Sequence, residues 1–235
     1  MATSGTTAFG MDFMEIAEEA WERAGREMRS GYDLRTARRS MNLLTIEWAN
    51  RGINMWTIAE GSITLGVGDS EYALADDGII DVIEHFIREN AGTSTQSDLA
   101  INRVSVSTYA AIPNKRATGR PLQLFVERLG QRNNESIINV WPIPDKEYTL
   151  CYFYLRRIED ATSASGDITK NNPDMTFRFL PCLVAGLAYY IAMKVPELMP
   201  RIEMLKTIYE EQFAMAAAED REKASVRFVP SIGYH

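Results

Sequence analysis

Apolar residues near the start of the chain recur at intervals of three and four, which is the spacing of one helix face. These positions are Phe13, Ile16, Ala17, Ala20, Trp21, Ala24 and Met28. Glutamates fill the opposite face, so the segment is predicted to be an amphipathic helix that ends at Ser30-Gly31.

A second stripe of the same kind follows after a short link. It consists of Leu34, Ala37, Met41, Leu44 and Trp48. Asp33 is predicted to cap the start of this helix and Gly52 to end it. Two helices joined by so short a link are expected to pack antiparallel, with Trp21 and Trp48 buried between them.

Two different patterns follow the second helix along the chain. Residues 54–72 mix β-forming residues with glycines, which predicts short strands and turns. A third helix is then predicted from about Asp76, with His85 on its surface. Its apolar face would consist of Ile79, Val82, Ile83, Phe86 and Ile87.

The middle of the chain is rich in β-branched and aromatic residues. Residues 122–126, 137–141 and 148–155 are predicted strands. The last of these is apolar on both faces, so both faces are expected to be covered by protein.

Helical patterns return towards the end of the chain. One helix carries Leu180, Leu187 and Ile191 on a single face and is stopped by Pro196. A last long helix begins near Pro200. Its stripe consists of Ile202, Leu205, Tyr209, Gln212 and Ala216.

The predicted fold class is therefore α+β, a helical bundle with an inserted β-rich part of antiparallel or sandwich-like strands. Residues 11–108 and 174–225 form the helical domain, and residues 109–160 form the β-rich domain. Residues 161–173 form a loop and residues 226–235 an extended C-terminal tail.

Composition excludes several classes of protein. The chain has 235 residues, 46% of them hydrophobic and 24% charged, which is ordinary for a globular protein that needs no metal or disulfide. A net charge of −7 argues against a surface that holds nucleic acid. The longest apolar run, residues 179–193, is shorter than the roughly 20 residues a bilayer requires, so no stable membrane insertion is expected.

Catalytic chemistry has no visible motif. Cys151 and Cys182 lie in apolar runs without metal-ligand spacing and are predicted to be buried thiols. We predict no catalytic residue, no metal site and no cofactor. Dispersed carboxylates leave one alternative open, a cell-wall hydrolase, because glycoside hydrolysis needs only two well-placed carboxylates.

Two segments are candidates for contacts with other proteins. Lys115, Arg116 and Arg120 surround a turn directly before a strand. They predict a solvated loop, a phosphate contact, or a contact to an acidic neighbouring subunit. The apolar, β-prone tail cannot easily bury itself, so it is predicted to lie on another chain. Its candidate contact residues are Val226, Arg227, Phe228 and Val229.

Several sequence runs, in order, resemble the head-to-tail adaptors of short-tailed bacteriophages, also called tail accessory factors or tail tubular proteins. The runs are ARRSMNLL at 37–44, GINMW at 52–56, YAAIPNK at 109–115, GRP at 119–121, FVER at 125–128, VWPIPD at 140–145 and YLRR at 154–157. Each run alone is a packing or turn pattern, and their shared order carries the resemblance.

The resemblance implies a structural virion protein, assembled in the host bacterial cytoplasm, that forms a dodecameric ring between the portal protein and the tail nozzle. DNA would pass through the lumen without sequence-specific binding, and the C-terminal segment would reach the portal. An acidic lumen would repel phosphates and leave the DNA mobile. Another neck or tail protein, such as a connector completion or nozzle protein, stays open as an alternative.

Overall fold

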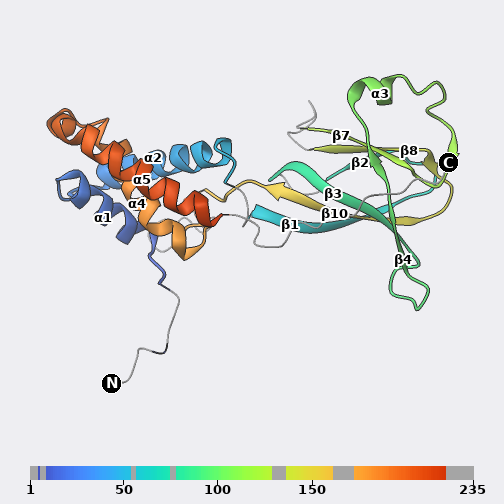
Figure 1. Cartoon of the computed structure of the whole chain (residues 1–235), viewed down its shortest axis with the longest axis horizontal. Helices are drawn as coiled ribbons and strands as arrows, with labels where there is room; N and C mark the ends of the chain where they lie inside the picture. The colour runs from blue at the N-terminus through green and yellow to red at the C-terminus, as the bar shows by residue number, and fades with distance from the viewer. Residues whose placement is uncertain are drawn as a thin grey trace. The chain divides into compact units, whose positions relative to one another are not determined.

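The chain folds into two compact units (Figure 1). The computed structural model describes residue 5 and residues 9–53, 57–74, 78–128, 136–160 and 172–220. The helical unit consists of residues 1–56 and 158–235, and the β-rich unit of residues 57–157. The α+β class predicted from the sequence is confirmed.

The described part of the helical unit contains four helices, one of which packs against the other three. They are α1 (Phe13–Ala24), α2 (Gly31–Asn50), α4 (Leu180–Ala192) and α5 (Ile202–Glu219), with 3₁₀ turns η2 (Phe177–Phe179) and η3 (Pro196–Arg201). Helix α4 contacts each of the other three, whereas α1 and α2 contact each other only slightly. The first two helices are therefore not a simple antiparallel pair, because both pack on α4.

Helix ends follow local hydrogen bonding. The side chain of Asp12 accepts from the amide of Glu15, and Glu15 accepts in return from the amide of Asp12. Helix α2 begins earlier than predicted, because its N-cap is Ser30. Asp33 is instead buried in the first turn, where Arg26 pairs with its carboxylate at 3.2 Å.

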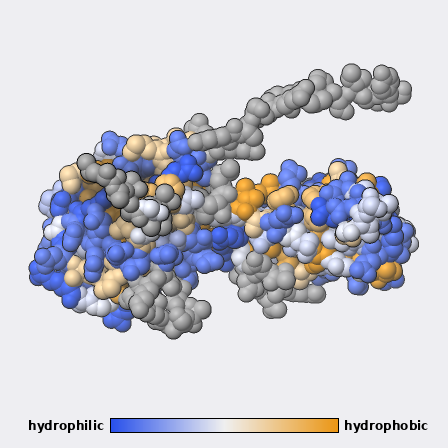
Figure 2. Space-filling model, turned by 90° about the horizontal axis from the view of Figure 1, so that it is seen from below, coloured by the Kyte–Doolittle hydropathy of each residue, from blue (hydrophilic) through white to orange (hydrophobic). Residues whose placement is uncertain are grey.

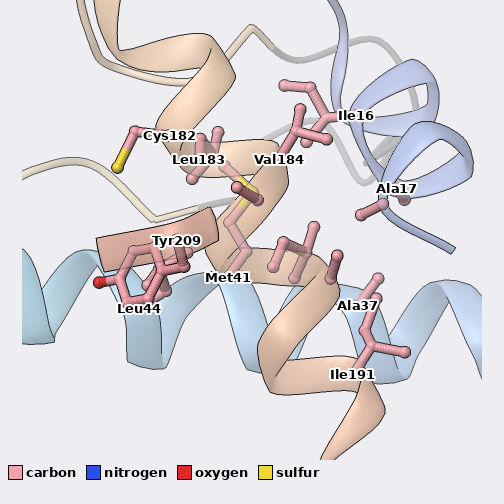
Figure 3. Close-up of a cluster of buried hydrophobic side chains, with 14 of the residues drawn as sticks. Ile16, Ala17, Ala37, Met41, Leu44, Cys182, Leu183, Val184, Ile191 and Tyr209 are labelled. Atoms are coloured by element: carbon pink, nitrogen blue, oxygen red, sulfur yellow. The ribbon is translucent and has the colours of Figure 1, made fainter. Parts of the chain in front are cut away.

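The helical core is dense and apolar (Figure 3). Trp21 and Trp48 are 1% and 0% exposed, so their predicted burial is confirmed. Their predicted position between the first two helices is wrong for Trp48, which lies against Phe179 of η2 and Phe213 of α5. Its burial depends on segments more than 100 residues away in sequence.

The described part of the β-rich unit contains two four-stranded sheets that share one core, and a separate sheet of two short strands. The spatial order of the first sheet is β1 (Ile58–Leu65), β10 (Tyr148–Arg156), β3 (Ile79–Glu89) and β4 (Ser97–Ala100), all antiparallel. That of the second is β2 (Glu71–Ala73), β8 (Ile137–Trp141), β7 (Gln123–Glu127) and β5 (Asn102–Arg103), with only β5 parallel to its neighbour.

Alternation along β10 explains the shared core. Tyr148, Leu150 and Tyr152 are buried on the face that meets the second sheet. The ring of Tyr152 occupies the space beside Gly61, where an added Cβ would lie 2.7 Å from it. The other face is covered less completely than expected, because Cys151 is buried but Phe153 is 36% exposed.

The predicted third helix is wrong, because residues 79–89 form strand β3. Register shifts interrupt its pairing with β10 on both sides of Val82. Each shift inserts one extra residue, so Ile79 and Val82 point to the same face as Ile87 although their spacing is uneven. The intervals between these apolar residues therefore resemble those on one face of a helix.

The domain boundary therefore differs from the one expected at residue 108. Residues 57–108 group with the β-rich unit, because their strands complete its two sheets. Most of the predicted loop 161–173 and all of the predicted tail 226–235 lie outside the described residues. Both predicted cysteine environments are confirmed, since Cys151 and Cys182 are free and buried.

Candidate functional site: a basic loop on the β-rich unit

The predicted basic cluster lies on a loop that is fixed to the β-rich unit. Helix α3 (Val106–Ala110) precedes it, and two short parallel strands, β6 (Thr118–Gly119) and β9 (Ile143–Pro144), hold its far end. The indole nitrogen of Trp141 donates to the carbonyl of Asn114 at 2.9 Å. The loop is thus anchored at both ends and in its middle.

Lys115 is used inside the unit. Its ammonium group donates to the carbonyls of Ala110 at 3.1 Å and Ile112 at 3.2 Å, at the C-terminal end of α3. It also lies 5.6 Å from the ring centre of Tyr109, which stacks on Phe125. This lysine therefore stabilises the loop and offers less to a partner than the sequence suggested.

Arg116 and Arg120 are exposed on the same loop. The backbone amide of Arg116 donates to the side chain of Asn114 at 3.1 Å, which sets the turn. Within the described parts of the chain, neither guanidinium group forms an ion pair. Both remain available for a carboxylate or a phosphate.

A second basic cluster was not found from the sequence. Arg103 and Arg128 both pair with the carboxylate of Asp81, Arg103 at 2.8 Å. Arg103 also donates to the carbonyl of Val82 at 2.6 Å. Because these residues come from three segments far apart in sequence, no local motif could have indicated them.

This arginine pair borders a shallow hollow of about 510 Å³ beside α3. Its apolar lining includes Val106 and Phe125, and Val106 is 67% exposed. The two guanidinium groups are balanced by Asp81 and by Glu127, which also lines the hollow, so the rim carries both signs of charge. The hollow can receive a protein side chain, but it holds no acid–base pair suited to catalysis.

His85 lies on strand β3 and not on a helix surface as expected. Its side chain is half-buried, and neither ring nitrogen has a hydrogen-bond partner among the described residues. Burial lowers the pKa of His85 below its ordinary value of 6.5. The negative charge of Glu84 opposes this shift, and the positive charge of Arg103 adds to it. The histidine is therefore held neutral as part of the sandwich interior.

The described residues contain no cluster of three His, Cys, Asp or Glu side chains that could hold a metal ion. Burial also raises the pKa of both thiols, that of Cys182 to about 12, so they stay protonated. None of the helices in the described part is long and apolar enough to span a membrane. The four candidate tail residues, 226–229, lie outside the described residues.

One family model matches nearly the whole chain. It is that of the SU10 adaptor protein, and the match covers residues 11–230. The chain belongs to this adaptor family. A comparison with curated proteins finds no match.

The SU10 adaptor family consists of phage adaptors, which are structural components of the virion. The family therefore implies a role without catalysis and an association with other virion proteins. Membership agrees with the adaptor resemblance of the sequence runs, and the match spans both units.

Proposed function

We propose that this adaptor forms a closed, dodecameric ring that joins the portal of a short-tailed phage to its tail nozzle. The family match over both units is the observation that carries the proposal. In this arrangement the ring gives the genome a passage during retention and ejection, without sequence-specific contact.

The distribution of charge supports a passage that does not hold DNA. The chain carries 32 acidic and 25 basic residues, so a lumen lined by its average surface repels phosphates. Several basic side chains are also used within the protein, as Lys115 and Arg103 show. Exposed Arg116 and Arg120 are better suited to an acidic neighbour or to the nozzle than to a polyanion.

Co-assembly tests the proposal directly. Full-length protein is mixed with the portal protein encoded by the same genome, and the products are examined by native mass spectrometry and negative-stain microscopy. A ring of adaptor on the portal is the expected result. Failure to bind the portal, together with binding at another position of the neck or tail, would contradict it.

The C-terminal tail provides a second test. Deletion of residues 226–235 is expected to leave the melting temperature nearly unchanged and to weaken portal attachment severely. A truncated protein that melts several degrees lower but binds portals normally would show that the tail packs on its own unit.

Enzyme assays test the alternative that the chain is a cell-wall hydrolase. Purified protein is expected to show no turnover on peptidoglycan or nucleic acid. Cleavage that disappears on replacement of a single carboxylate would show that the virion role is accompanied by catalysis.

A further inference from the structure

On the side away from α4, helix α2 presents a ridge that no other described part of the chain covers. Its exposed residues are Tyr32, Arg35, Arg39, Leu43, Ile46 and Asn50, which follow one another at steps of three and four. Leu43 and Ile46 are 54% and 58% exposed, unusual values for two aliphatic residues on one helix face. Apolar patches of this kind interrupt the polar surface of the helical unit (Figure 2).

A groove of about 310 Å³ lies elsewhere on the same unit, between α1 and α5. Its floor includes Ala185 and Ala188 of α4, which are too small to fill it. Met204 and Ile208 of α5 form one wall and are 48% and 38% exposed. Arg23 on the opposite wall is neutralised by Glu19 at 2.7 Å. Arg201, whose guanidinium lies beside Gly25 just after α1, leaves one positive charge in the lining of the groove.

The groove and the ridge lie on roughly opposite sides of α4. Tyr190 faces α2, where it hydrogen-bonds to Glu47, and Gly186 lies between α2 and α5, since a Cβ there would be 2.8 Å from Tyr209 and 2.9 Å from Leu44. At 100° per residue, this face is about 150° from the direction of the groove-lining alanines. One subunit thus carries two different, oppositely placed surfaces, as a ring subunit requires.

We propose that the α2 ridge of one copy of this chain inserts into the α1–α5 groove of the next copy. The inference rests on the proposed ring and names the contact that would close it. Residue spacing supports this contact, because an antiparallel alignment of α2 with the neighbour's α5 places exposed apolar residues opposite one another. Ile46 then meets Met204, and Leu43 meets Ile208.

Charge fixes the register of this alignment. One turn beyond the apolar pairs, Arg39 on the ridge comes opposite Glu211, which follows Ile208 by three residues on α5, just beyond the groove lining. Both side chains are exposed, and neither is ion-paired within the described parts of the chain. The adjacent Glu210 is already paired with Arg51, and the one basic residue of α5, Lys206, lies on the opposite flank of the helix and does not meet the ridge.

Cysteine cross-linking tests the contact. Leu43→Cys and Ile208→Cys are introduced together in the full-length chain, which is oxidised alone at high concentration and after mixing with the portal protein. A ladder of covalent multimers is expected on non-reducing gels, because each copy is linked to two neighbours. Cys151 and Cys182 are 3% and 1% exposed and should not form disulfide bonds in this experiment.

Three controls test whether the contact joins two different surfaces of neighbouring copies. Neither single variant should cross-link alone, and a mixture of the two should stop at a dimer, because each pair of copies then has only one competent contact. Leu43→Cys combined with Lys206→Cys is the matched control on the other flank of α5 and should give no ladder. A dimer from Leu43→Cys alone would overturn the proposal, because it shows a symmetric contact.

Charge exchange provides an independent measurement. Arg39→Glu and Glu211→Arg should each weaken assembly by about two- to fivefold per contact, and the double variant should restore it. If adaptors assemble on the portal without the ladder and without this rescue, the contact is wrong while the adaptor function stands. If the full-length chain neither binds portals nor cross-links, both proposals fail.

Discussion

The indole nitrogen of Trp48 donates a hydrogen bond to the hydroxyl of Tyr209 at 3.0 Å, across 161 residues of sequence. The same hydroxyl donates to the carboxylate of Glu47 at 3.2 Å, and Tyr190 donates to that carboxylate too. Arg51 pairs with Glu47 at 2.6 Å. Burial raises the pKa of Tyr209, and that of Tyr190 to about 12, so both phenols remain neutral donors.

Trp48→Ala should therefore destabilise the helical unit by about 3–5 kcal/mol, because it removes a large buried ring and leaves a cavity. Trp48→Phe should cost less, since it keeps an aromatic ring but loses the N–H donor. Urea unfolding followed by circular dichroism measures both changes. A loss below about 1 kcal/mol for Trp48→Ala would mean that the site relaxes to fill the space.

Gly186→Ala should also destabilise the helical unit, although alanine is the better helix former. The new Cβ would lie 2.8 Å from the ring of Tyr209 and 2.9 Å from Leu44, both buried. Overpacking of this kind costs about 1–3 kcal/mol, which exceeds the gain of about 1 kcal/mol in helix propensity. Gly31→Ala is the matched control in α2, because open space surrounds that position, and its melting temperature should not fall.

The stability of the β-rich unit should depend on pH in a way that shows His85 to be buried in its neutral form. The unfolded chain takes up this proton near pH 6.5, but the folded chain does so only at lower pH, because burial lowers the pKa. Stability from the neutral ring is thus complete above pH 6.5 and is lost as the pH falls towards the folded value.

His85→Phe should flatten this loss between about pH 6.5 and 5, a window above the ordinary carboxylate range. Thermal melts of both proteins across the window give the comparison. Parallel curves for the two proteins would contradict a buried neutral histidine.

Arg116→Ala and Arg120→Ala should leave stability within about 0.5 kcal/mol, since both side chains are exposed. If the basic loop contacts a neighbour or the nozzle, both variants should slow attachment and make it less sensitive to salt. Lys115→Met should instead lower the melting temperature of the β-rich unit, because it removes the ammonium group from the end of α3. Normal attachment by the arginine double variant would exclude the loop from the contact.

The sequence predicted the amphipathic helices well, because each has one uninterrupted apolar face. Helix α2 runs to Asn50, close to its predicted end at Gly52, whereas α1 ends at Ala24, before the predicted stop at Ser30-Gly31, because Gly25 adopts a left-handed conformation there. Strands β7, β8 and β10 were also predicted, since they are rich in β-branched and aromatic residues. These elements carry their structural signal within a short stretch of chain.

The failures have a common physical cause in contacts made over long distances. Strand β3 was taken for a helix because its register shifts alter the alternation around Val82, and the partner strand that fixes the register lies far along the chain. The pairing of Arg103 and Arg128 with Asp81 likewise joins three separate segments. Lys115 was correctly placed in a loop, but its role at the end of α3 depends on the three-dimensional turn.

The pairing of Ile58 with Leu155 places the two ends of the β-rich unit on neighbouring antiparallel strands. Cα atoms of such a pair are only about 5 Å apart, so a bridge of a few residues could replace the whole unit. Recombination at these two points could exchange one sandwich for another while leaving the helical framework continuous. An exchange of the β-rich unit would thus change the surface that it carries without a break in the chain of the helical unit.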